Sequence, residues 1–451
     1  MVNDQHQEEI PDADHIFPDS ENQRQGLVFS SRTFLCQYMK KKLLLLASAA
    51  VIGNAAHAQY RTPAQQIITN EDSLHSGLVK QKTVISGYGS AYYTRNTNLQ
   101  QSTASLDRVV LFVGHQFNSR ISFFSEMEIE NALVAGMEQK GEISMEQAFL
   151  KFSINPKNYI VAGLFIPRIG ILNENHLPVN FNGVHRPLVE SLVIPATWRE
   201  LGIGFYGGLN SAPVHYTVSL INGLNSANFE HGTGIVEGRA EGGLATANNL
   251  AVNASIQYQP GRFKFQVSGY MGGTVGLSPR GADSLKLNSG AFGTPIYLGE
   301  ADVQYANKGW QAKVLGTYIS FPEADKINAA YGKNTAKAMY GAYAEVGYDL
   351  LHLFKGYKKQ GQLVVFTRYE MFDLNAEMPT APDGIYDGTL KQSHLFAGFS
   401  YLPIPNVVIK ADVQFVNTGD QNPGLIINPA PNALPYQTTN TLLNLGIGYS
   451  F

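Results

Sequence analysis

The alternation of residues at the C-terminus, residues 441–451, constrains the fold of this chain more than any other feature. The segment reads TLLNLGIGYSF, and from Leu443 onward apolar side chains occupy every second position, with Asn, Gly and Ser between them. Such a period of two is typical of a β-strand with one apolar face and one small or polar face. A terminal strand with aromatic side chains invites aggregation unless it is paired. We therefore predict that it is the last strand of a closed barrel.

Four residues of this strand also form a pattern at fixed offsets from the C-terminus: Asn444, Gly446, Tyr449 and Phe451. A polar residue, a glycine and two aromatic residues in this order resemble the signal by which Gram-negative outer-membrane barrels are recognised for insertion. The pattern implies that the barrel-assembly machinery and outer-membrane lipid, including lipopolysaccharide, are partners of the chain.

Residues 39–58 have the three parts of a secretory signal peptide. Met39 and three lysines form the positive n-region, LLLLASAAVIG forms the apolar h-region, and AHA at residues 56–58 is an A-x-A cleavage site. The predicted mature chain therefore begins at Gln59 and is exported, which together with the C-terminal pattern predicts the outer membrane of a Gram-negative bacterium. Residues 1–38 are polar, acidic and without strand or helix periodicity, so we interpret them as a non-native or disordered upstream extension.

The composition of the mature chain excludes several classes of protein. The only cysteine, Cys36, precedes the cleavage site, so disulfides and thiol catalysis are excluded. Residues 1–58 hold 7 acidic and 5 basic residues of the 36 and 33 in the whole chain, which leaves a net charge of −1 and no electrostatic case for nucleic acid. The longest apolar run, residues 43–53, is much shorter than the roughly 18 residues of a spanning helix.

From residue 83 to residue 451 we predict sixteen strands of about ten residues, a length that crosses a bilayer when the strand is tilted. The connections alternate between long, beginning after the first strand, and tight, such as Asn118-Ser119 and Pro260-Gly261. A transmembrane antiparallel β-barrel with short periplasmic turns and long extracellular loops produces this alternation; fourteen or eighteen strands remain open. The predicted strands are residues 83–93, 107–117, 120–130, 145–154, 158–168, 199–207, 213–222, 249–259, 262–272, 296–306, 309–320, 338–348, 361–371, 391–402, 405–416 and 441–451.

Charged side chains within the strands are predicted to face the lumen, because Arg or Lys on the lipid face at mid-bilayer costs roughly 2 to 4 kcal/mol. Sixteen strands enclose a channel wide enough for water, so we expect a wet pore unless a loop or a plug closes it. Residues 59–82 are predicted to be a periplasmic segment too short for a plug domain, which leaves the outer loops as the constriction. The side chains assigned to the lumen are Glu126, Glu128, Glu130, Lys264, Glu300, Asp302, Lys313, Glu345, Arg368, Glu370, Lys410 and Asp412.

The connection between the fifth and sixth predicted strands, residues 169–198, is the predicted pore-constricting loop. It reads IGILNENHLPVNFNGVHRPLVESLVIPATW, with three prolines and many apolar side chains that a solvated loop does not need. Such a loop is expected to pack on the inner barrel wall and narrow the pore. Its candidate residues, with those that flank it, are Arg168, Glu174, His176, His185, Arg186, Glu190 and Arg199.

Two interpretations of the three arginines remain open. They form a local ring that attracts anions, or they pair with Glu174, Glu190 and Glu200 as structural ion pairs that hold the loop down, and we favour the ion pairs. The lumen carboxylates likewise either favour cations or pair with lysines of neighbouring strands. His176 and His185, nine residues apart, are interpreted as ordinary hydrogen-bonded side chains, so neither a metal site nor a cofactor is predicted.

The loop and its flanks resemble the phosphate-selective porin O and P family of outer-membrane porins from Bacteroidetes-type bacteria. The similar segments are densest at residues 163–207, which contain GLFIPRIGILNENH, FNGVHRPLVES and IPATWRELGIGFYG. DRVVLFVGHQFNSRISFFSEMEIENA, MEQAFLKFSI and YLPIPNVVIKADVQF extend the resemblance over most of residues 86–451. It implies a sixteen-stranded homotrimeric barrel with an inward-folded third loop, for passive uptake of small anions or other solutes.

Selectivity for phosphate is not carried over from this resemblance. Anion-selective members of the family place basic residues along the pore, whereas the lumen positions assigned above hold eight acids and four bases. The predicted function is an outer-membrane porin for passive diffusion of small hydrophilic solutes or ions, with phosphate or other anions as candidates. The alternative is a non-conducting barrel that serves as an adhesion or structural anchor. An enzyme is not expected, because the sequence contains no G-x-S-x-G, no H-E-x-x-H and no metal-spaced cysteines.

Overall fold

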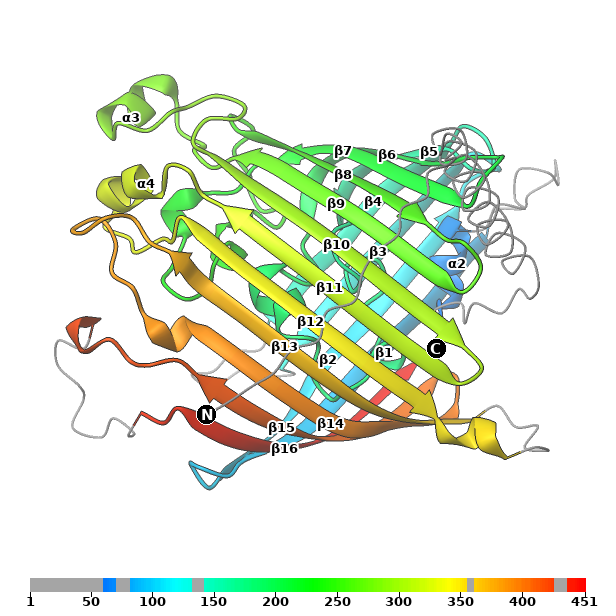
Figure 1. The fold of residues 1–451 in the computed structure, drawn as a ribbon. Coiled ribbons are helices and arrows are strands. Elements are labelled where there is room, and N and C mark those ends of the chain that lie inside the picture. Colours follow the sequence, from blue (N-terminus) through cyan, green and yellow to red (C-terminus); the bar gives the residue numbers. More distant parts are fainter. Residues whose placement is uncertain (1–59, 70–81, 132–141, 355–360, 426–435) are drawn as a thin grey trace, which may run out of the picture. The chain divides into compact units, whose positions relative to one another are not determined.

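The computed structural model describes residues 60–69, 82–131, 142–354, 361–425 and 436–451, all of which belong to one compact unit, Ala55–Phe451. Within it, sixteen antiparallel strands close into a barrel in which each strand pairs with its neighbours in sequence and the last pairs with the first (Figure 1). The predicted fold class and strand number are confirmed. The predicted upstream extension, residues 1–38, and signal peptide, residues 39–58, lie outside the described residues.

The strands form the wall of the barrel, and the helices lie in its loops or at the N-terminal end of the described chain. The strands are β1 Lys82–Asn96, β2 Gln101–Gln116, β3 Ile121–Glu130, β4 Glu142–Ser153, β5 Tyr159–Phe165, β6 Glu200–Gly208, β7 Val214–Asn222, β8 Leu250–Tyr258, β9 Phe263–Gly273, β10 Pro295–Asn307, β11 Trp310–Ser320, β12 Ala338–Asp349, β13 Gln362–Glu377, β14 Lys391–Ile404, β15 Val407–Thr418 and β16 Thr439–Ser450. The helices are α2 Pro63–Thr69, α3 Pro279–Ser284 and α4 Ala324–Tyr331, with short helical turns η3 Pro178–Asn180, η4 Val189–Val193, η5 Ser226–Asn228, η6 Val236–Gly238, η7 Leu350–Leu353, η8 Gly388–Leu390 and η9 Pro423–Leu425.

Every predicted strand overlaps an observed one, but the long loop expected after the first strand is wrong. Strands β1 and β2 continue to a turn at residues 97–100. Polar side chains stabilise the extended hairpin, since Arg95 donates to the hydroxyl of Ser102 at 3.1 Å and the Tyr93 hydroxyl donates to it at 2.9 Å. Apolar alternation does not reveal such a polar strand end, because its side chains face water or each other on both faces.

The two faces of the barrel differ as the alternation in the terminal strand predicts. In β16, Leu445 and Ile447 are 55% and 56% exposed on the outer face, whereas Asn444 is 2% exposed on the inner face. Large apolar side chains are exposed on strands all around the barrel in the same way, for example Ile85, Val267 and Val314 on β1, β9 and β11. Among the described residues, no helix is long and apolar enough to cross a membrane.

The N-terminal segment, residues 60–69, lies against the inner face of β1, β2 and β3. The Ala64 N–H donates to Ser86 Oγ at 3.1 Å, and Ser86 is buried whereas its neighbour Ile85 is exposed. The Tyr60 hydroxyl accepts a bond of 2.6 Å from Asn406, in the turn between β14 and β15. The expectation that the outer loops alone constrict the lumen is therefore wrong, because this segment also occupies the interior.

Candidate functional site

The loop of residues 169–198 lies inside the barrel and supplies much of its core. Leu177, Val189 and Trp198 of this loop are completely buried, and they belong to one apolar cluster with wall residues such as Tyr88 and Tyr343. Burial against the wall explains why the loop carries so many apolar side chains. Because apolar burial contributes about 25 cal/mol for each Å² removed from water, the inward position of the loop is strongly favoured.

Two glycines of β16 give the loop the room that it needs. A Cβ atom at Gly446 would lie 2.9 Å from Val184 Cγ1, and a Cβ atom at Gly448 would lie 2.6 Å from Pro178 Cβ. Carbon atoms that are not bonded do not approach each other so closely, so the backbone of β16 meets the loop directly at both positions. Gly446, predicted from its place in the C-terminal pattern, thus also has a packing role.

Polar groups of the loop bind charged and amide side chains on strands at several positions around the wall. These bonds satisfy loop backbone groups that would otherwise be buried without partners. They run from Gln266 on β9 to the Gly170 carbonyl (3.0 Å), from Arg368 on β13 to the Asn182 carbonyl (2.9 Å), from the Val189 N–H to Glu370 on β13 (3.1 Å) and from the Val184 N–H to Asp412 on β15 (2.7 Å).

All twelve side chains predicted to face the lumen lie on the inner face of the barrel, but most of them do not face water. Nine are buried, and only Glu130, Lys264 and Lys313 keep partial exposure. The condition attached to the expected wet pore, that no loop closes it, is therefore not met at the level of the loop. Ion pairs, wall side chains and polar groups of the loop contact several of these charges, whereas Lys410 Nζ has no hydrogen-bond partner among the described residues and lies 3.6 Å from the centre of the Phe181 ring.

Arg368 is the most enclosed cation of this set. Its Nε donates to Glu370 at 2.7 Å and its NH1 donates to Glu345 at 3.2 Å, while the guanidinium lies 4.4 Å from the centre of the Phe396 ring. The same NH1 donates to the Asn182 carbonyl at the tip of the loop. Charge-assisted bonds of this kind are about twice as strong as neutral ones, so Arg368 connects the loop tip firmly to β12 and β13.

Of the three ion pairs suggested by the sequence, only that of Arg168 with Glu174 forms, at 3.7 Å. Glu174 also pairs with Lys264 on β9 and accepts a hydrogen bond from Gln257 at 3.0 Å. Burial alone would raise the pKa of the Glu174 carboxyl, but Lys264 and Arg168 hold it well below its usual range. This carboxylate therefore stays ionised and fastens the start of the loop to the wall.

Glu190 binds the loop itself rather than an arginine. Its Oε2 accepts the N–H groups of Ile171 and Leu172, each at 2.7 Å, and its Oε1 accepts the hydroxyl of Tyr343 on β12, also at 2.7 Å. Burial raises the pKa of Glu190, and these three hydrogen bonds offset only part of that effect. The side chain joins the two ends of the loop to each other and to the wall.

Arg199 and Arg186 also differ from the suggested pairing. Arg199 donates to Glu241, in the connection between β7 and β8, at 2.9 Å. Glu200 instead accepts a bond of 3.1 Å from the indole N–H of Trp198. One guanidinium nitrogen of Arg186 is buried and has no hydrogen-bond partner among the described residues. Arg168 and Arg199 are therefore both paired with carboxylates, and Arg199 has a different partner from the one suggested by the sequence.

A mixed-charge group between the loop and the wall consists of Asp107 and Arg108 on β2, Glu130 on β3, and His185 and Arg186 in the loop, all partly exposed. Arg108 pairs with Asp107 at 3.1 Å and with Glu130 at 3.4 Å. Burial lowers the pKa of His185, although Asp412 and Asp107 act in the opposite direction. A solute that passes between the loop and β2–β3 would contact this group. The cost of a charge in lipid also predicts that Arg108, on β2, faces the lumen. We did not assign it there from the sequence.

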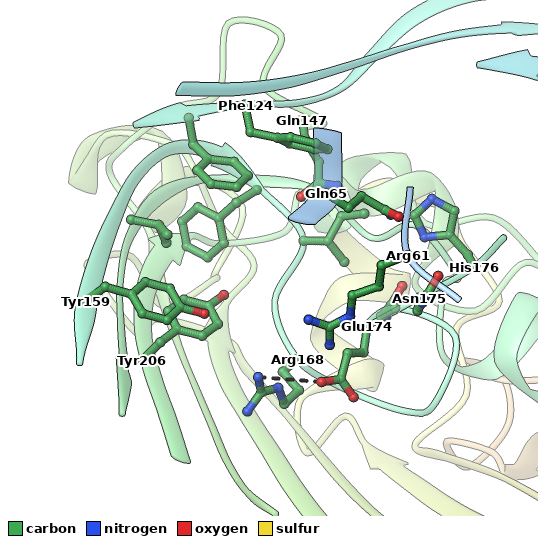
Figure 2. Close-up of a pocket in the computed structure, with 15 residues that line it drawn as sticks. Arg61, Gln65, Phe124, Gln147, Tyr159, Arg168, Glu174, Asn175, His176 and Tyr206 are labelled. Carbon is green, nitrogen blue, oxygen red and sulfur yellow. Dashed lines mark ion pairs between the residues drawn. The ribbon is translucent and has the colours of Figure 1, made fainter. Parts of the chain in front are cut away.

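A cavity of about 170 Å³ separates the loop from the wall on the side of β3 to β6. Figure 2 shows Arg61 and Gln65 from the N-terminal segment, Glu174 and His176 from the loop and Gln147 from β4 among the side chains that line this cavity. The predicted residues His176, Glu174 and Arg168 thus share one cavity, whereas His185, Arg186 and Glu190 are not among its lining residues. The contribution of the N-terminal segment was missed, because no local periodicity links residues so far apart in sequence.

Comparison with known proteins identifies one family relationship and one shared fold. The chain is 32% identical over 347 residues to an uncharacterised protein of Aquifex aeolicus (strain VF5), which covers 74% of this chain and 76% of that protein. No protein-family model matches the chain. An anion-selective porin from Comamonas acidovorans superposes with a TM-score of 0.50 at 10% identity, covering 82% of this chain and all of that one. The outer membrane channel DcaP of Acinetobacter baumannii superposes with a TM-score of 0.47 at 11% identity, over 82% of this chain and 97% of that one.

Proposed function

The chain belongs to the same family as the uncharacterised protein of Aquifex aeolicus, and we propose that it is an outer-membrane channel for passive diffusion of small hydrophilic solutes or ions. The observation that carries the proposal is the position of residues 169–198, which cross the lumen of a closed sixteen-stranded barrel and bind its wall. A loop in this position narrows a channel and selects what passes. The proposed role is a channel and not an enzyme.

The outward face of the barrel supports the proposed location. Exposed apolar side chains on nearly every strand suit contact with lipid, whereas charged strand residues face inward. The signal peptide predicted at residues 39–58 and the C-terminal pattern ending in Phe451 support export and insertion into the outer membrane. We extend the proposal to a homotrimer, on the resemblance to porins in the sequence alone.

The mixed-charge group is the proposed contact surface for the solute. Arg186 is partly exposed, so the accessible part of its guanidinium would bind an anionic or carbonyl oxygen of a passing solute. Glu130 and Asp107 place negative charge beside it. Selection would then depend on the balance of both signs. Anions, including phosphate, remain candidates on the basis of Arg186 and of the anion-selective porin that shares the fold.

The burial of nine lumen charges favours the second candidate, a non-conducting barrel that serves as an anchor or an adhesin. Single-channel recording of the full chain in planar bilayers distinguishes the two. Stable conductance steps are expected for the channel, and their absence from a correctly folded barrel supports the anchor. Under a salt gradient, Arg186→Gln should shift the reversal potential toward cation preference, whereas Glu130→Gln should shift it toward anion preference.

A disulfide between the loop and β16 tests whether the loop moves during conduction. A Cβ atom at Gly446 would lie 3.5 Å from Val184 Cβ, which is within the range for a disulfide. The oxidised Val184→Cys, Gly446→Cys variant should conduct like its reduced form if solutes pass beside a fixed loop. Loss of conductance on oxidation, recovered with dithiothreitol, would show that the loop must move. The single variant Val184→Cys is the matched control for oxidation.

A further inference from the structure

Three ligand-type side chains meet inside the barrel, next to the cavity but outside the mixed-charge group. They are Glu126 on β3, Glu146 on β4 and His176 in the loop, and all three are buried. His176 Nε2 lies 3.0 Å from Glu126 Oε1 and 3.8 Å from Glu146 Oε2. One nitrogen or oxygen atom from each residue lies within 4.8 Å of the others.

An irregularity in the sheet aims Glu146 into this cluster. The pairing of β3 with β4 shifts between Glu126, opposite Gln147, and Met127, opposite Met145, so Glu146 has no partner residue on β3. Such a bulge places an additional side chain on one face. Here Glu146 and Gln147 both reach the interior, since Gln147 donates to Glu126 Oε2 at 2.6 Å while Glu146 is completely buried.

The carboxylate of Glu146 has no adequate partner. Neither of its oxygens accepts a hydrogen bond from the described part of the chain, and the nearest nitrogens of basic side chains, on His176 and Arg199, are each 3.8 Å away. Arg199 makes its closer contact with Glu241, at 2.9 Å. Arg108 pairs with Asp107, Glu128 and Glu130 instead, and no ion pair of Arg186 with Glu146 forms among the described residues. A buried carboxylate without a hydrogen-bond donor is costly, and the carboxyl groups of Glu126 and Glu128 beside it add like charge, so a bound cation would relieve both effects.

We propose that Glu126, Glu146 and His176 bind a divalent first-row transition metal ion, with Zn²⁺ as the best fit. One imidazole nitrogen and two carboxylate oxygens form a ligand set that zinc uses at about 2.0–2.2 Å, in a tetrahedron whose ligand atoms are roughly 3.4 Å apart. The separations of 3.0 and 3.8 Å from His176 bracket that value. Magnesium and calcium prefer oxygen ligands alone, which argues against them.

The neighbouring cavity provides access and a place for a fourth ligand. His176 and Gln147 line it, so a water molecule there could complete the coordination. Because His176 belongs to the loop and the two glutamates belong to the wall, the metal would cross-link the loop to β3 and β4. This role is independent of the proposed channel function, since a non-conducting barrel would bind the ion equally well.

The test uses the untagged full-length chain, purified in detergent, treated with a chelator and then equilibrated with Zn²⁺. Mass spectrometry of the metal content is expected to find one zinc ion per chain, and calorimetry to find a single tight site. Glu146→Gln should weaken zinc binding by at least about tenfold. Glu130→Gln removes the same charge from the same strand as Glu126, outside the ligand set, and should bind zinc normally.

Two results would overturn the proposal: wild-type protein that retains no more zinc than Glu146→Gln, or Glu130→Gln that loses as much zinc as Glu146→Gln. Heat-modifiable migration in gel electrophoresis reports whether each variant has folded. If Glu146→Gln does not fold, His176→Gln serves instead, because it changes the loop and leaves the wall intact. X-ray absorption at the zinc edge provides a second reading, with one imidazole among nitrogen and oxygen ligands as the expected result.

Discussion

Glu190 illustrates how one side chain determines the shape of a long loop. Three donors converge on its two oxygens, from Ile171, Leu172 and Tyr343, so its removal leaves buried N–H and O–H groups without acceptors. An amide at this position can accept at only one of its two terminal atoms. Leaving a buried donor without a partner costs about 1–3 kcal/mol.

Glu190→Gln is therefore expected to destabilise the inward position of the loop by about 1–3 kcal/mol. Guanidinium unfolding in detergent micelles measures this, with the fluorescence of Trp198 as the reporter in a Trp310→Phe background, since the chain has 2 tryptophans. Glu230→Gln, an exposed loop position, is the matched control. Equal unfolding midpoints for the two variants would contradict the anchoring role.

The difference in stability between wild type and Glu190→Gln is expected to depend on pH. Because burial raises the pKa of Glu190 in the folded protein, the folded state binds a proton at a higher pH than the unfolded state does. Stability from this group therefore rises as the pH falls through the raised pKa toward the ordinary value of 4.5, and it is lost as the pH rises. The stability advantage of wild type over Glu190→Gln should be larger at pH 5 than at pH 7.5. An advantage that shrinks on acidification would show that the sign is wrong.

The sequence predicts the direction of a strand side chain better than its partner. The cost of a charge in lipid directs Arg368 and Glu370 inward, and the structure places both there. This argument from cost does not reveal that Arg368 binds the Asn182 carbonyl. Nor does it reveal that Glu190 accepts hydrogen bonds from backbone N–H groups instead of pairing with an arginine. Partners of this kind depend on the path of a loop in three dimensions, which no local spacing determines. Glu146 was not predicted for a related reason. A bulge in β4 interrupts the alternation of inward and outward side chains in that strand.

At the scale of elements, the loop and the N-terminal segment hold each other in place. Asn180 in η3 binds the backbone of Tyr60 twice, accepting its N–H and donating to its carbonyl, each at 3.0 Å. Asn175 donates to the same carbonyl at 2.8 Å. The strands were predictable because each contains its own alternation, whereas this contact joins residues 120 positions apart. A short segment without periodicity gives no sign of where it docks.

Asn180→Leu keeps the size of the side chain and removes both of these bonds. Local opening of residues 60–69 should become easier by about 1–2 kcal/mol, which corresponds to roughly tenfold faster hydrogen exchange at the Ala64 amide. Exchange followed by mass spectrometry measures this directly. Asn228→Leu, at an exposed position in η5, is the control and should leave that amide unchanged. Unchanged exchange in Asn180→Leu would mean that other contacts hold the segment.

For the whole molecule, closure follows from the last strand. β16 pairs with β15 on one side and with β1 on the other, with Tyr449 opposite Gly89 and Leu445 opposite Tyr93. Closure removes both sheet edges, which is why an aromatic strand can end the chain without a free edge. The sequence could predict this architecture because the alternation, most of the loop lengths and the terminal pattern agree. It could not predict a filled lumen, since filling depends on contacts between distant segments.

A barrel in a bilayer should tolerate charge on its outer face according to depth. Val267, at the middle of β9, and Ile143, at one end of β4, are 63% and 72% exposed, so neither loses much packing on substitution. Val267→Arg should cost about 2–4 kcal/mol in lipid vesicles, where the charge meets hydrocarbon, and Ile143→Arg about 0–1 kcal/mol near the interface. Reversible guanidinium unfolding in vesicles measures both. Equal costs at the two positions would show that this face does not lie in lipid. In water, the cost of an exposed arginine would not depend on its position along the strand.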